Sequence, residues 1–175
     1  MSLTETPICN FGEKAKDFDL LSTENKKTSL DNVKGKNGTL IMFICNHCPY
    51  VKAVIRDIVK DAKYLETLGI KSAAIMSNDV KNYPEDSFEN MISFSKTHNF
   101  TFPYLIDETQ EVAKEFGAVC TPDFFGYNKK LELQYRGRIR ELKNLKPVGK
   151  GDSDLNTAMK LITTLFADLL QEGTR

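Results

Sequence analysis

Two cysteines three residues apart, Cys45 and Cys48, lie between an apolar run and an amphipathic segment. The run at 39–44 is almost continuously apolar, as is typical of a strand buried on both faces in a parallel sheet. After it the apolar residues take the spacing of one helix face, at Val51, Val54, Ile55, Ile58, Val59, Ala62 and Leu65. The sequence therefore predicts a dithiol where a central strand ends and a long helix begins.

The rest of the chain alternates between strand and helix patterns. Strands are expected at 70–76, 102–106, 124–127 and 131–136, and helices at 84–92, 112–116 and from a cap near Ser153 to Leu169. The basic segment 140–152, which contains proline and glycine, is interpreted as a solvated loop. Strands and helices in alternation, followed by a late hairpin, predict an α/β sandwich with a mixed sheet.

Charge and hydropathy exclude several classes of protein. Lys and Arg total 24, as do Asp and Glu, so the net charge of zero argues against nucleic acid or an acidic membrane as partner. No stretch approaches the roughly 18 apolar residues of a membrane span. Residues 1–18 show no signal-peptide pattern, so a cytoplasmic location is expected. At 175 residues, the chain is expected to form one domain over 1–175.

Four cysteines are too few for a disulfide scaffold in a chain of this length. A C-x-x-C pair in a reducing compartment indicates redox chemistry or metal binding. The metal alternative would combine Cys45, Cys48, Cys120 and either Cys9 or a histidine. The chain has no second C-x-x-C and no H-x(3–5)-H, so we predict a redox pair with no metal and no cofactor.

A helix N-terminus suits a thiolate, because its first N–H groups lack partners and its dipole favours negative charge. We expect Cys45 to be the exposed nucleophile and Cys48, one turn on, to resolve the mixed disulfide. His47 lies between them. As an imidazolium it would favour the Cys45 thiolate and make the disulfide more oxidising; the alternative is an exposed histidine with little effect.

Three stretches resemble a known family: 42–52 (MFICNHCPYVK), 77–79 (SND) and 120–125 (CTPDFF). Together with 102–107 (FPYLID), they resemble the redoxin branch of the thioredoxin superfamily, which includes AhpC/TSA-like peroxiredoxins and thioredoxin-like reductases. They are most similar to a bacterial group named "thioredoxin family protein" that carries the motif CNHCPYVK.

This resemblance implies a thioredoxin-like three-layer sandwich, with a mixed central sheet flanked by helices. It implies that Pro122 is cis, precedes the C-terminal hairpin and lies beside the dithiol. Thr121 would then offer backbone hydrogen bonds to an extended substrate. The implied partners are a protein or low-molecular-weight disulfide and an upstream thiol reductant or oxidant. Cys120 is either a third redox cysteine or a small buried side chain.

The sequence departs from thioredoxin at two positions. The tryptophan before the first cysteine is Ile44, and the buried acid six residues before that cysteine is Thr39. Proton transfer to and from Cys48 therefore needs another group, and Asp79 and Asp107 are the candidates.

The leading hypothesis is a thiol–disulfide oxidoreductase, and the alternative is a thiol peroxidase. Peroxiredoxins bind peroxide with P-x-x-x-T-x-x-C. The threonine position holds Met42 when counted from Cys45, and Cys45 when counted from Cys48. The peroxide-binding threonine is absent in both alignments. A third hypothesis is a non-catalytic adaptor that holds a partner around Tyr50, Phe124 and Phe125.

Overall fold

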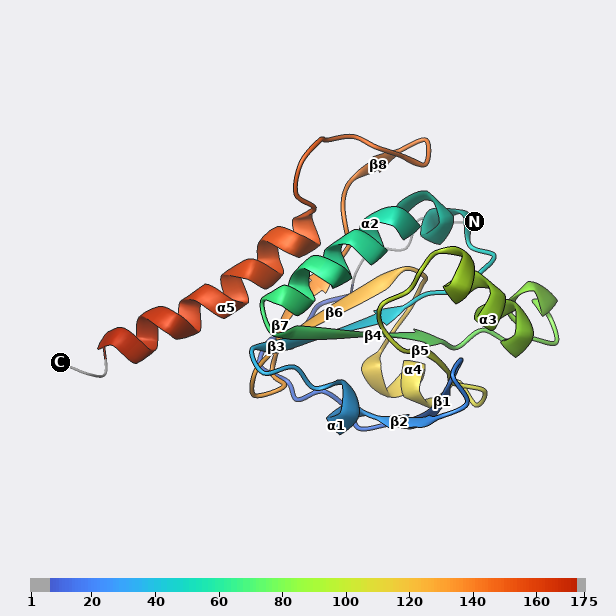
Figure 1. Cartoon of the computed structure of the whole chain (residues 1–175), viewed down its shortest axis with the longest axis horizontal. Coiled ribbons are helices and arrows are strands. Elements are labelled where there is room, and N and C mark those ends of the chain that lie inside the picture. Colours follow the sequence, from blue (N-terminus) through green and yellow to red (C-terminus); the bar gives the residue numbers. More distant parts are fainter. Residues whose placement is uncertain (1–6, 173–175) are drawn as a thin grey trace.

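The chain folds around a seven-stranded mixed sheet with the strand order β2-β1-β5-β4-β3-β6-β7 (Figure 1). The structure is a computed structural model and describes residues 7–172. Its strands are β1 (Asp19–Ser22), β2 (Lys27–Ser29), β3 (Gly38–Phe43), β4 (Ile70–Met76), β5 (Tyr104–Ile106), β6 (Asp123–Asn128) and β7 (Leu133–Gly137). A separate two-stranded ribbon pairs β8 (Leu142–Lys143) with β9 (Lys146–Pro147).

Strand β3 is central and carries the chain to the cysteines. It runs parallel to β4 and antiparallel to β6, and all six of its residues are buried. Because both faces of this strand are covered, its sequence is an apolar run without alternation. Thr39, the polar residue in the run, is satisfied because its hydroxyl accepts the backbone N–H of Gly35 at 3.1 Å.

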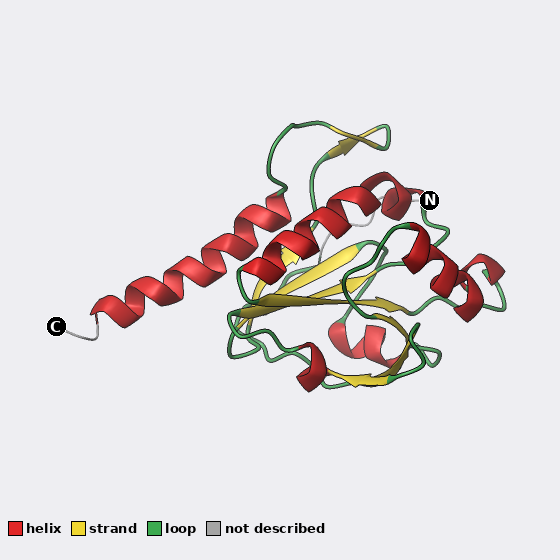
Figure 2. Cartoon of the chain, in the orientation of Figure 1, coloured by secondary structure: helices red, strands yellow, loops and turns green. Residues whose placement is uncertain are grey.

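Helices cover both faces of the sheet (Figures 1 and 2). The helices α2 (Pro49–Thr67), α3 (Phe88–Thr97) and α5 (Asp154–Glu172) contribute to one apolar core. The short helices α1 (Leu30–Val33) and α4 (Glu111–Phe116) contribute to the core on the opposite face, and a single 3₁₀ turn, η1 (Pro84–Asp86), precedes α3. This three-layer arrangement confirms the predicted thioredoxin-like sandwich.

Local signals account for the helix ends. Ser87 caps α3 by accepting the N–H of Asn90, and Gly117 ends α4 with φ +68°, a conformation that glycine adopts without strain. Within residues 7–172, no helix combines the length and the apolar character needed to cross a membrane. Residues 1–18 were expected to contain no signal peptide, and residues 1–6 of that segment lie outside the described residues.

The structure adds elements that hydrophobic periodicity did not predict. Strands β1 and β2 and helix α1 are too short to show a period. The segment expected to be a solvated loop contains the β8–β9 ribbon, which projects from the body beside α5 (Figure 2). Arg140 in this segment is largely covered, because its Nε lies 3.0 Å from a carboxylate oxygen of Asp57 on α2.

A buried polar cluster joins α2 to the start of α5. The Asp61 carboxylate on α2 accepts the Ser153 hydroxyl at 2.5 Å and the Asn156 side-chain amide at 3.2 Å. The Ser153 hydroxyl in turn accepts the N–H of Asn156, as a helix cap does. This confirms the predicted cap at Ser153 and adds a partner for it 92 residues away.

Burial raises the pKa of Asp61, although its two hydrogen bonds act in the opposite direction. A carboxyl group whose pKa is raised by folding stabilises the fold below its unfolded pKa, and this stability is lost as the pH rises through the folded value. We therefore expect Asp61→Asn to flatten the dependence of the unfolding free energy on pH above about pH 4. Urea unfolding across this range is the measurement, and Glu108→Gln, at an exposed carboxyl, is expected to keep the parent profile.

Candidate active site

The two cysteines lie in the loop between β3 and α2, as the sequence predicts. Strand β3 ends at Phe43, α2 begins at Pro49, and Cys48 is the N-cap residue of the helix. Proline fits the first helical position because the N–H it lacks would have no partner there. The helix N-terminus therefore lies at Cys48, one turn after Cys45.

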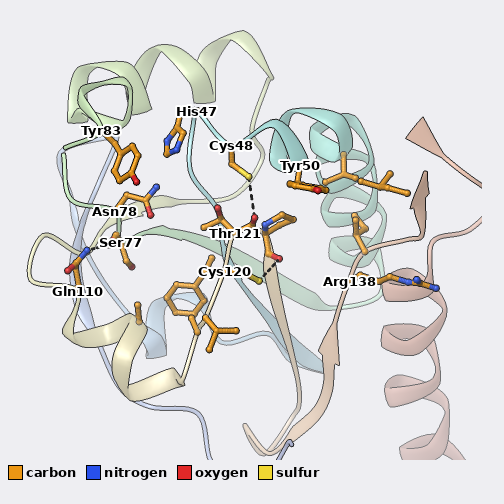
Figure 3. Close-up of a pocket in the computed structure, with 18 of the residues that line it drawn as sticks. His47, Cys48, Tyr50, Ser77, Asn78, Tyr83, Gln110, Cys120, Thr121 and Arg138 are labelled. Atoms are coloured by element: carbon orange, nitrogen blue, oxygen red, sulfur yellow. Dashed lines mark hydrogen bonds between the residues drawn. The ribbon is translucent and has the colours of Figure 1, made fainter. Parts of the chain in front are cut away.

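Of the two cysteines of the pair, Cys48 lines a large groove on the surface. Its side chain lines a cavity of about 910 Å³, with His47 on one side and Tyr50 on the other (Figure 3). The backbone N–H groups of Val51 and Tyr50, in the first turn of α2, contribute to lowering the pKa of its thiol. When protonated, Cys48 donates to the carbonyl of Thr121 at 3.2 Å.

Cys45 lies behind Cys48 and is fully buried, with 0% of its surface exposed. It is not among the described residues that line the groove. Its sulfur lies 3.3 Å from the hydroxyl oxygen of Thr121. The expectation that Cys45 is exposed is therefore wrong. It assumed that the helix begins at Cys45, whereas α2 begins at Pro49 and Cys48 is its N-cap residue.

The two sulfurs differ in acidity. A hydrogen bond from the Cys45 thiol is the main cause that lowers the pKa of Cys48, and the N–H groups of the first helical turn act in the same direction. The bond to Cys48 and burial both raise the pKa of Cys45. The thiolate that attacks disulfides therefore forms more readily on Cys48.

The loop before β6 completes this side of the site. The peptide bond between Thr121 and Pro122 is cis, as predicted, and precedes the β6–β7 hairpin. Both residues line the groove, and Thr121 contacts each cysteine, through its hydroxyl and its carbonyl group. The structure thus brings together the four residues that the sequence assigned to the dithiol and its neighbouring loop.

A buried carboxylate, Asp86, approaches the loop from the 3₁₀ turn η1. Its Oδ1 accepts the backbone N–H of Asn46 at 2.7 Å and that of His47 at 3.2 Å. Its Oδ2 lies 2.6 Å from Nδ1 of His47 and accepts the side-chain amide of Asn78 at 2.8 Å. Asp86 therefore fixes both the cysteine loop and the imidazole within it.

His47 is held on its other side by an aromatic stack. Its ring lies parallel to that of Tyr83, at an interplanar angle of 5° and a centroid distance of 4.7 Å (Figure 3). The neighbouring Asn46 is held in turn, because its side chain accepts the Tyr104 hydroxyl at 3.0 Å and donates to the carbonyl of Glu85. His47 is thus an ordered part of the site.

Asp86 was not predicted as a site residue, because residues 84–87 match the first turn of a helix, where acids are common. The two acids proposed for proton transfer lie elsewhere. Asp107 accepts the Ser77 hydroxyl and the N–H of Ala113, and Asp79 accepts the side-chain amide of Asn82. Asn78, which binds Asp86, belongs to one of the motifs on which the resemblance rests.

The remaining predicted residues divide between groove and core. Cys120 lines the groove and is exposed, so the interpretation as a buried side chain is wrong. Tyr50 also lines it, and so does Arg138, a residue that was not predicted as part of the site (Figure 3). Phe124 and Phe125 are core residues of β6, which removes two of the three aromatics from the proposed adaptor surface.

The alternative metal set of Cys45, Cys48, Cys120 and either Cys9 or a histidine is not assembled in the described part of the chain. Within residues 7–172, the structure brings together one group of three or more metal-binding side chains, Cys45, His47 and Asp86, whose donor atoms lie within 4.8 Å of one another. Structural zinc sites use four ligands, and both oxygens of Asp86 already accept hydrogen bonds. We assign no metal to this group, and metal analysis of protein purified without chelator tests that choice.

Comparison with known proteins places the chain among redox proteins of this fold. The AhpC/TSA family matches residues 11–142. An uncharacterized conserved protein from Geobacillus kaustophilus is 39% identical, with a TM-score of 0.82 over 86% of this chain and 80% of that one. A hypothetical protein from Sinorhizobium meliloti 1021 is 32% identical, with a TM-score of 0.83 over 90% and 86% of the two chains.

A more distant structure shares the fold. A thiol:disulfide interchange protein of the thioredoxin family from Chlorobium tepidum TLS is 18% identical, with a TM-score of 0.66 over 89% of this chain and 99% of that one. No curated protein sequence is significantly similar to the chain.

Proposed function

The chain belongs to the AhpC/TSA family of thioredoxin-fold oxidoreductases, and we propose that it exchanges thiols and disulfides through Cys45 and Cys48. The observation that carries this proposal is the position of Cys48, which is the N-cap residue of α2 and lines the groove, while Cys45 is fully buried beside it. A sulfur that lines the groove and has a lowered pKa, and a second thiol within hydrogen-bond distance, are the two parts that exchange requires.

The cysteines take roles opposite to those expected from the sequence. The Cys48 thiolate attacks a substrate disulfide and forms a mixed disulfide, and the other substrate sulfur leaves and takes up a proton. Cys45 then loses its proton and attacks Cys48, which releases the second substrate thiol. Two electrons pass to the substrate as the Cys45–Cys48 disulfide forms. The same steps in reverse oxidise a dithiol.

The groove supports a substrate larger than a single thiol. It extends from Tyr83 and His47 past the loop of Thr121 to Arg138. The proposed substrate is therefore a protein segment or a low-molecular-weight disulfide, with an upstream thiol reductant or oxidant as the second partner. We place this exchange in the cytoplasm, where the thiols of a reduced pair persist.

Direct detection of the disulfide tests the proposal. Reduced protein mixed with one equivalent of a model disulfide is expected to yield two substrate thiols and a Cys45–Cys48 bond. The bond is detected by alkylating the free thiols and mapping peptides by mass spectrometry, since the chain has no Trp to report oxidation by fluorescence. Recovery of both cysteines in alkylated form after full consumption of the disulfide would overturn the proposal.

The runner-up is a thiol peroxidase, which family membership favours. Three residues before Cys48, the position of the peroxide-binding threonine is taken by Cys45, which is buried and makes a thiol contact instead. We therefore expect hydrogen peroxide to be consumed far more slowly than a model disulfide. Stopped-flow measurement of both reactions, with trapping of a Cys48 sulfenic acid, separates the two functions.

A further inference from the structure

The proposed exchange leaves one step without a chemical group to perform it. Cys45 must lose its proton before it can attack the mixed disulfide at Cys48. The hydrogen bond to Cys48, the main cause that raises the pKa of Cys45 in the reduced protein, is absent once Cys48 is bonded to substrate. Burial and the charge of Asp86 still raise this pKa, so water is a poor acceptor for the proton at neutral pH. Thr39 lies at the strand position where thioredoxin carries a buried acid. Its hydroxyl cannot replace that acid as a base, and it already accepts a hydrogen bond from the backbone N–H of Gly35.

Two side chains that can accept protons, His47 and Asp86, lie near the buried thiol of Cys45. One ring nitrogen of His47 and a carboxylate oxygen of Asp86 lie within 4.8 Å of the Cys45 sulfur and of each other. This separation allows proton transfer through one water molecule or after a small movement of the thiol. Asp86 itself is fully buried and held by four hydrogen bonds, so its position relative to the loop is fixed.

The hydrogen bond between these residues also sets the proton on the ring. Because Nδ1 lies 2.6 Å from an Asp86 oxygen, the neutral ring carries its proton on Nδ1 and donates it to the carboxylate. The pair formed by a neutral ring and the ionised carboxylate carries a negative charge, so the pair as a whole can take up one further proton.

We propose that the hydrogen-bonded pair of His47 and Asp86 is the base that takes the proton from Cys45 during resolution of the mixed disulfide. This proposal rests on the proposed function. The Cys45 S–H bond breaks, its proton passes to the pair, and the electron pair left on sulfur forms the bond to Cys48. The Cys48–substrate bond breaks, and the leaving substrate sulfur takes the proton from the pair. Atoms and charge balance without a further reactant.

Other titratable groups around the pair do not offer the same path. Cys48 is bonded to substrate during this step. Tyr83 stacks on the face of the imidazole, and the Tyr104 hydroxyl donates to the Asn46 side chain. Burial raises the pKa of Tyr104 well above its usual value, so this group stays protonated. In the described part of the chain, the ion-pair partner of Asp86 is His47 and no Lys or Arg.

The experiment separates the two chemical steps in a Cys9→Ser/Cys120→Ser background, in which Cys45 and Cys48 are the remaining thiols. With the chromogenic disulfide 5,5′-dithiobis(2-nitrobenzoic acid), attack by Cys48 releases the first equivalent of coloured thiol and resolution by Cys45 releases the second. Asp86→Asn places an amide against Nδ1 and favours the wrong ring tautomer. We expect this variant to slow the second release by about 100-fold or more near pH 7, with the first release little changed.

The pH profile distinguishes a missing base from a disturbed fold. In the Asp86→Asn variant the second release is expected to rise in proportion to hydroxide from about pH 6 to about pH 9, whereas the release from the parent is expected to depend less steeply on pH. His47→Gln, at a side chain on the groove, is expected to show the same profile without altering the buried carboxylate. The matched control is His98→Gln at the end of α3, which is expected to behave as the parent.

Each other outcome is decisive. An unchanged second release and pH profile in both variants would overturn the inference and leave the proposed function intact. Equal slowing of both releases would also overturn it, because the pair would then act on Cys48. Absence of the first release from the parent protein would overturn the proposed function itself.

Discussion

Replacement of Cys48 by serine is expected to abolish disulfide turnover, with a loss of at least about 1,000-fold. A serine hydroxyl at the N-cap stays protonated at neutral pH and does not attack sulfur, so the helix N-terminus has no thiolate to stabilise. Cys45→Ser is expected to have a different effect. It retains the attacking sulfur and accumulates a mixed disulfide through Cys48. Intact-mass spectrometry under non-reducing conditions detects the adduct, and peptide mapping locates it.

The two serine variants also decide which cysteine attacks. The order expected from the sequence predicts the reverse pattern, in which Cys48→Ser traps an adduct on Cys45. That result would contradict the roles proposed above. Cys9→Ser is the matched control, since this thiol is not among the described residues that line the groove and donates to the carbonyl of Pro7. Its turnover is expected to stay within about twofold of the parent.

Gly35→Ala is expected to lower the free energy of unfolding by about 3 kcal/mol or more. A Cβ atom at this position would lie 2.5 Å from the backbone nitrogen of Lys71 and 2.8 Å from the carbonyl oxygen of Gly69, and closer still to the carbonyl oxygen of Gly38. All three obstacles are backbone atoms at the start of β3 and β4, which cannot rotate away as a side chain does. The thermal midpoint is expected to fall by about 6 °C or more.

Circular dichroism is the appropriate probe for this unfolding, and Gly149→Ala is the control. A Cβ atom at Gly149 meets nothing within 4 Å, so this substitution is expected to change stability by less than about 0.5 kcal/mol. Equal midpoints for the two variants would show that the approach of β3 to β4 at Gly35 is looser than the structure indicates.

The long elements were predictable because burial imposes a period on their sequence. The strand expected at 70–76 coincides with β4, and the apolar spacing from Val51 to Leu65 identifies the buried face of α2. Strands β1 and β2 have four and three residues and lie at the edge of the sheet, where no period develops. Strand β2 pairs with β1, and β1 pairs with β5, 82 or more residues later in the chain than β1, a contact that sequence spacing does not encode.

The parts of the candidate site formed by residues close together in the sequence were predictable, and the parts formed by contacts between distant residues were not. Cys45, His47 and Cys48 are contiguous, and the Thr121–Pro122 loop was found through the resemblance to redoxins. The relative burial of the two cysteines was not predicted, because it depends on where within five residues α2 begins. Asp86 was missed because its role arises from a contact across 39 residues of sequence.

The location of Asp86 has a consequence for how this enzyme can diversify. The acid is buried, but it belongs to the connection between β4 and α3 and not to a strand of the sheet, so its replacement removes no strand pairing. Surface connections tolerate change far better than buried strands. Exchange of residues 77–87 among relatives would thus alter proton handling while the scaffold remains, provided that an acceptor for the N–H groups of Asn46 and His47 is retained. The reactivity of the dithiol and the stability of the sheet can in this way evolve separately.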